Sequence, residues 1–73
     1  MTVRVTFIFE NKHVEVDLSK ELGRDRVLVK DFLKLLGLTP LTAVAVRDGK
    51  LLVDEDVIMD GDSIEVYTVT SLG

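Results

Sequence analysis

The sequence predicts an α+β fold: a mixed sheet of four to five strands with one main helix packed on one face. Stretches at both ends of the chain alternate apolar and polar residues with a period of two, which is typical of strands with one buried face. Between them, residues 27–36 place apolar side chains at helical spacing. A chain of 73 residues has room for one small core, so we expect a single domain over residues 1–73.

The N-terminal part is predicted to form a β-hairpin from residues 2–9 and 13–18. The polar turn between them contains Asn11, which can take the left-handed conformation that a tight turn needs. The first segment carries Arg4 early, so we interpret it as a strand and not as a signal sequence. The apolar side chains of the hairpin that we expect to face the core are Val3, Val5, Phe7, Phe9, Val14, Val16 and Leu18.

Two helical segments are predicted next. Ser19 has the chemistry to cap a single helical turn that Gly23 would end. The main helix is predicted over residues 27–36, with Gly37 as its stop. Its apolar stripe follows the spacing i, i+3, i+4 and i+7 and consists of Val29, Phe32, Leu33 and Leu36.

The second half of the chain is predicted to supply the remaining strands. In residues 43–47 we assign Val44 and Val46 to the core-facing side, and Asp48-Gly49 is a strong turn signal before a short strand at 50–53. Val57 and Ile58 are expected to fill the bottom of the core. The final strand is predicted to begin near residue 63. Its Ile64 and Val66 are expected to face the core, like the alternate apolar residues of the first strand.

The order of elements is therefore β, β, α, β, short β, β. A final strand placed in the centre of the sheet, beside the first strand and parallel to it, would bury both hydrophobic runs. That arrangement is the β-grasp, or ubiquitin-like, architecture.

Composition excludes several classes of function. A net charge of −4, with 13 acidic and 9 basic residues, argues against nucleic acid as a partner and is compatible with docking onto a basic protein surface. No run approaches the roughly 20 apolar residues of a membrane span, so we expect no membrane contact and a cytoplasmic protein. The absence of cysteine excludes disulfides and thiolate chemistry. The absence of Gln and the single Asn favour a thermophilic source.

The chain offers no catalytic or metal site and predicts no cofactor. His13, the only histidine, falls on the polar side of a strand with no positioned partner nearby in sequence. The acidic segment 54–62 fails as a calcium loop, because Ile58 occupies a ligand position and Met59 stands where the turn needs glycine. Gly49-Lys50 lacks the flanking residues of a phosphate-binding loop.

The outer face of the sheet is the more informative surface. The predicted alternation gathers there an apolar patch formed by Ile8, Ala43, Ala45, Tyr67 and Val69. Its predicted rim consists of Arg4, Arg47 and Glu65. Such a patch on a small protein favours a partner-binding surface, for which we single out Ile8, Ala45, Tyr67 and Val69. The alternative is that the sheet simply exposes some β-forming residues.

Three stretches together carry a family resemblance: VKDFLKLLGL at 29–38, AVAVRDGK at 43–50 and DGDSIEV at 60–66. In this order and spacing, followed by a short tail that ends in glycine, the chain resembles the ThiS/MoaD-type sulfur carriers, prokaryotic relatives of ubiquitin. The resemblance covers essentially the whole sequence once the N-terminal hairpin is included.

The resemblance implies a carrier and not an enzyme. A partner activating enzyme, which binds the ATP, would adenylate the carboxylate of Gly73, and the adenylate would become a thiocarboxylate. The sulfur would pass to a synthase for thiamine or molybdopterin, or to a tRNA base; in some archaeal relatives the activated terminus joins lysines of target proteins. Thr70, Ser71 and Leu72 would form the flexible tail, at about 70–73, that threads into the partner.

The tail departs from the family pattern, because relatives end in Gly-Gly and this chain has Leu72 before Gly73. Three explanations stay open: an activating enzyme that tolerates Leu, a terminus that has lost residues, or a relative that has left carrier chemistry. The alternative function is a ubiquitin-like protein modifier or β-grasp binding module without sulfur transfer.

Overall fold

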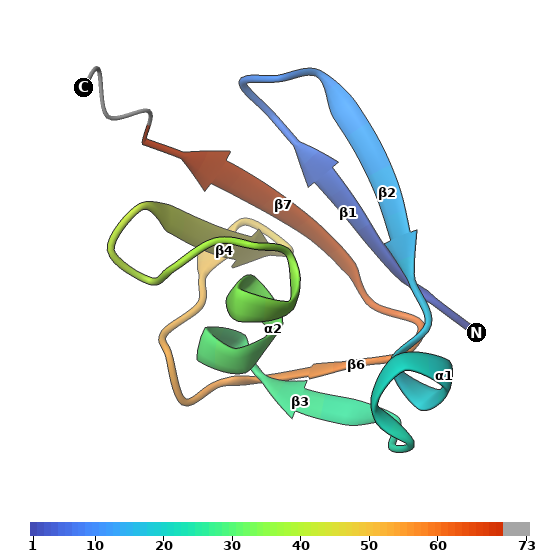
Figure 1. Cartoon of the computed structure of the whole chain (residues 1–73). Coiled ribbons are helices and arrows are strands. Elements are labelled where there is room, and N and C mark those ends of the chain that lie inside the picture. The colour runs from blue at the N-terminus through green and yellow to red at the C-terminus, as the bar shows by residue number, and fades with distance from the viewer. Residues whose placement is uncertain (70–73) are drawn as a thin grey trace.

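The computed structural model describes residues 1–69, so the predicted tail at 70–73 lies outside the described residues. Five strands form one mixed sheet in the order β2-β1-β7-β4-β5 (Figure 1). They are β1 (Val3–Phe7), β2 (Lys12–Val16), β4 (Ala43–Arg47), β5 (Lys50–Leu51) and β7 (Ser63–Thr68). The main helix, α2 (Val29–Leu35), packs on one face. The α+β class, the mixed sheet and the β-grasp arrangement are confirmed.

The first and last strands lie side by side in the middle of the sheet. β7 runs parallel to β1, with Arg4 opposite Ser63 and Phe7 opposite Val66. Its other edge pairs antiparallel with β4, where Val44 lies opposite Tyr67. The predicted central, parallel position of the last strand is confirmed.

Positive backbone dihedrals occur at the predicted turns. Asn11 adopts φ 51° in the β1–β2 turn. Asp48 and Gly49 adopt φ 54° and 75° between β4 and β5, and such values at both central residues define the turn type that best suits a two-residue hairpin. Both turn predictions are confirmed.

The core lies between the inner face of the sheet and α2. Phe32 and Leu33 of the helix are buried against the sheet, as their spacing predicts. The other predicted core residues that are buried are Val3, Val5, Leu18, Val29, Ile58, Ile64 and Val66. Phe7, Val14, Val16 and Leu36 pack against this cluster.

The assignment of faces on β4 was wrong. Ala45 is 1% exposed and Ala43 is also buried, whereas Val44 is 40% exposed. The register explains this, because Ala45 lies opposite Val66, a core residue, and directly paired residues share a face. Ala45 therefore faces the helix and does not belong to the outer surface, where Val44 takes its place.

Two further positions differ from the prediction. Phe9 is 70% exposed, because β1 ends at Phe7 and the turn that follows breaks the alternation. Val57 is exposed while its neighbour Ile58 is fully buried, so only Ile58 fills the bottom of the core.

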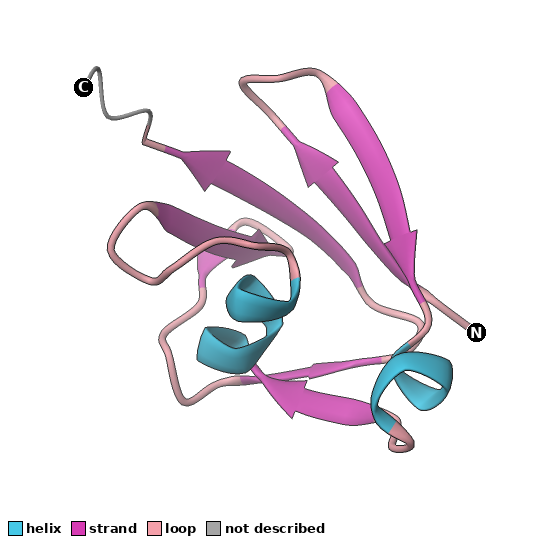
Figure 2. Ribbon diagram, in the orientation of Figure 1, coloured by secondary structure: helices cyan, strands magenta, loops and turns pink. Residues whose placement is uncertain are grey.

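The predicted main helix begins two residues late in the structure, because residues 26–28 form a strand. β3 (Arg26–Leu28) pairs antiparallel with β6 (Val57–Met59) in a separate two-stranded sheet (Figure 2). Among residues 1–69, no helix is long and apolar enough to cross a membrane.

The short helix α1 (Leu18–Leu22) ends at Gly23 as predicted, with φ 72°, but Ser19 is not its cap. The N-cap is Asp17, whose carboxylate accepts a hydrogen bond from the Lys20 N–H at 3.0 Å. Ser19 lies inside the helix and donates its hydroxyl to Asp60 at 2.8 Å.

Asp60 connects the turn before β7 to the start of α1. Its carboxylate also accepts the backbone N–H of Leu18 at 2.9 Å and that of Ser19 at 3.1 Å. Desolvation opposes ionisation, but these hydrogen bonds and the N-terminal ammonium outweigh it and hold the pKa of Asp60 below its ordinary value. The ionised side chain thus stabilises the folded state.

We predict that Asp60→Asn lowers the thermal unfolding midpoint at pH 7, because the amide accepts these bonds less well than the carboxylate. A folded-state pKa below the unfolded value of about 3.9 makes this stabilisation complete above that pH, and it is lost as pH falls through the folded pKa. The difference in unfolding midpoint between wild type and variant, measured by circular dichroism, should therefore narrow as the pH falls from 7 through the folded-state pKa of Asp60. A gap independent of pH would contradict this role.

Candidate functional site

The candidate site is the face of the sheet that α2 leaves uncovered. Paired residues on neighbouring strands share a face, so the registers place the outer side chains in rows across the sheet. One row contains His13, Thr6, Glu65 and Val46. A second row joins Val44 to Tyr67 at the end of the sheet where β7 finishes.

An apolar patch covers that end of the face, and we define it by Ile8, Val44, Tyr67 and Val69. Ile8 lies one residue beyond β1, and its N–H donates to the Val66 carbonyl at 3.1 Å, which continues the pairing with β7. Val69 is 67% exposed, and its N–H donates to the Thr42 carbonyl at 2.7 Å. Ile8, Tyr67 and Val69 thus lie where the sequence predicted, and Ala45 does not.

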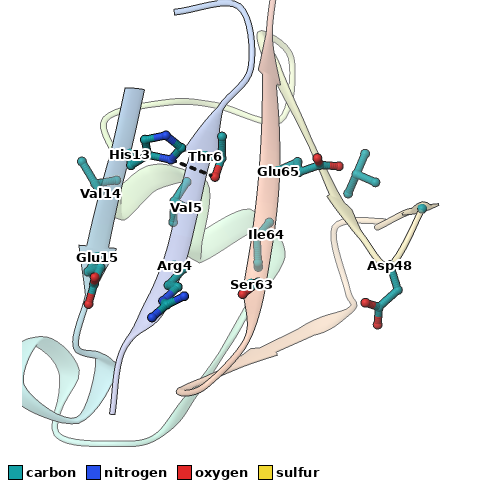
Figure 3. A pocket seen from close by; sticks show the side chains of 12 residues that line it. Arg4, Val5, Thr6, His13, Val14, Glu15, Asp48, Ser63, Ile64 and Glu65 are labelled. Atoms are coloured by element: carbon teal, nitrogen blue, oxygen red, sulfur yellow. Dashed lines mark hydrogen bonds between the residues drawn. The ribbon is translucent and has the colours of Figure 1, made fainter. Parts of the chain in front are cut away.

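The other half of the face is polar and hollowed into an open depression of about 800 Å³ (Figure 3). Arg4 and Glu65, which were predicted at the rim of the apolar patch, both line this depression. Arg47 instead is half-buried and donates to Asp62 at 2.8 Å and to the Val57 carbonyl at 2.9 Å, which ties β4 to the turn before β7.

His13 lies in this depression without the surroundings of a catalytic base. Its Nδ1 is 3.2 Å from the Thr6 hydroxyl, and the ring is exposed (Figure 3). Among the described residues, no group of three or more His, Asp or Glu side chains could hold a metal ion.

One feature next to the patch was missed from the sequence. The ring of Phe9 meets that of Tyr67 edge-on, with centroids 5.7 Å apart and planes at 74°. The neighbouring Glu10 carboxylate accepts a hydrogen bond from the Thr68 hydroxyl. The signal that could have found it is Asn11, because the turn that ends at Asn11 begins before Phe9.

The predicted reactive tail, Thr70, Ser71, Leu72 and Gly73, lies outside the residues that the structure describes. What the structure describes is the point from which that tail continues. β7 runs from the core to Thr68, and Val69 is held against Thr42 at the edge of the apolar patch.

Comparison with known proteins adds a relative along almost the full chain. No family model matches the sequence. The chain is 39% identical over 64 residues to the sulfur carrier protein TtuB of Thermus thermophilus, and the alignment covers 88% of this chain and 88% of TtuB. Together with the β-grasp sheet, this identity shows that the chain belongs to the ThiS/MoaD-type sulfur carriers, which are carriers and not catalysts.

Proposed function

We propose that this protein carries sulfur as a thiocarboxylate on the C-terminal carboxylate of Gly73. The observation that carries the proposal is the 39% identity to a sulfur carrier over 88% of both chains. The position of β7 supports it, because a central strand anchored on both edges holds the start of the tail on a rigid body. The apolar patch beside that point offers a docking surface for the enzyme that acts on the tail.

The reaction needs two steps, both in the active site of a partner activating enzyme that binds ATP. A carboxylate oxygen of Gly73 attacks the α-phosphorus of ATP, and pyrophosphate leaves. Sulfide sulfur then attacks the acyl carbon, and AMP leaves with that oxygen. The activated group is the acyl adenylate itself, so the carrier needs no nucleophilic side chain, which fits a chain without cysteine.

The tail residues Thr70, Ser71 and Leu72 would enter the narrow site of that enzyme, where a terminal glycine without Cβ passes most easily. The proposal entails an enzyme that accommodates Leu72. The thiocarboxylate would then serve a sulfur-accepting synthase for thiamine or molybdopterin, or the thiolation of a tRNA base.

We predict that the protein gains about 16 Da, the difference between sulfur and oxygen, when incubated with the activating enzyme of its own organism, ATP and sulfide. Intact-mass spectrometry measures the change, and a reaction without ATP is the control. The variant Leu72→Gly serves as a matched arm, and both chains should be modified. An unchanged wild-type mass beside a modified Leu72→Gly variant would mean that this chain has left carrier chemistry and favour a modifier or binding module.

The apolar patch is proposed as the surface that docks on the activating enzyme. We predict that Val44→Asp raises the KM for the carrier in ATP–pyrophosphate exchange by about tenfold or more, because it places a charge where the interface must exclude water. The control is Val53→Asp, since Val53 is 59% exposed in the loop after β5 and lies outside the patch. Equal KM values for the two variants would argue against docking through this face.

A further inference from the structure

The turn of the β1–β2 hairpin holds the end of β7. Figure 1 shows this turn and the C-terminal end of β7 at the same end of the sheet. Glu10 accepts the Thr68 hydroxyl although the two residues are 58 positions apart in sequence, and Phe9 meets Tyr67 edge-on at 5.7 Å. On the opposite side, the Val69 N–H donates to the Thr42 carbonyl. The β1–β2 turn on one side and Thr42 on the other therefore both contact the chain immediately before residue 70.

Folding alone does not account for these turn residues. Phe9 is 70% exposed and takes no part in the buried core, and Glu10 is also exposed. The ring of Phe9 gains little from burial, and its contact with Tyr67 is edge-on. The contacts coincide with the last residues before the predicted tail.

We propose that Phe9 and Glu10 are positioning residues that set the direction in which the chain leaves β7. This inference rests on the proposed function. Four residues follow Val69, and a fully extended chain of that length spans at most about 14 Å. Over so short a reach, the orientation of Thr68 and Val69 limits where the terminal carboxylate can arrive. A displacement of about 1 Å at a reacting group can cost about a hundredfold in rate.

The proposal separates docking from positioning. Removing a side chain of the apolar patch weakens binding and raises KM. Removing the contact of Phe9 with Tyr67, or that of Glu10 with Thr68, leaves the patch in place. It changes the direction in which the chain leaves β7, so the terminal carboxylate is misplaced in the active site and kcat falls. A role confined to stability would move neither parameter at temperatures well below unfolding.

The test is ATP–pyrophosphate exchange with the purified activating enzyme of the same organism. We expect Phe9→Ala and Glu10→Ala each to lower kcat by about tenfold, with KM within about twofold of wild type. Phe9→Tyr keeps the ring edge, and Glu10→Gln keeps an oxygen that accepts the Thr68 hydroxyl, so both should restore kcat. Val53→Ala, an exposed apolar substitution away from the turn, is the matched control and should behave as wild type.

Urea unfolding of every variant accompanies the kinetics. Alanine variants with the kcat and KM of wild type would overturn the positioning role while leaving the proposed function intact. A kcat loss that tracks a loss of folded protein, or that Glu10→Gln and Phe9→Tyr fail to restore, would overturn it as well. No exchange with wild-type carrier would overturn the proposed function and this inference together.

Discussion

The parallel pairing of β7 with β1 is the contact on which the rest of the structure depends. It joins the end of the chain to its beginning in the middle of the sheet, where both strands bury one face against α2. Ile64 and Val66 of β7 meet the same core as Val3 and Val5 of β1. Because β7 is paired on both edges, the residues that lead into the tail are fixed by the most deeply buried part of the protein.

Alternate residues of β7 pack the core and form the outer surface of the sheet. Val66 is fully buried, while Tyr67, its neighbour, lies on the opposite face in the apolar patch. The same division applies on β4, where Ala45 packs inward and Val44 is open. This small domain thus buries one face of its sheet against α2, and the opposite face carries the apolar patch that we propose as a docking surface.

Most of the fold could be predicted because its signals are periodic. The alternation of the hairpin, the helical stripe through Phe32 and the Asp-Gly turn each indicate one structure. The phase of β4 could not be predicted, because residues 43–46 are all apolar and hydrophobicity favours neither face. Val27 and Ile58 belong to strands of three residues, which are too short to show a period. The helical pattern was therefore extended wrongly to Val27. Of the predicted surface, Ala43 and Ala45 were wrongly included because the phase of β4 was misassigned, and both are buried. Phe9 was assigned to the core because the alternation was extended beyond the end of β1.

The central claim is that the sheet face opposite α2 is the surface that meets the activating enzyme. Methyl-labelled protein titrated with that enzyme tests it most directly by NMR, because adjacent residues on β4 face opposite ways. The account predicts that the methyl signals of Val44, Ile8 and Val69 shift or broaden, while those of Ala45 and of Leu35 on α2 change least. Larger changes at Leu35 than at Val44 would place the partner on the helix side and contradict the account.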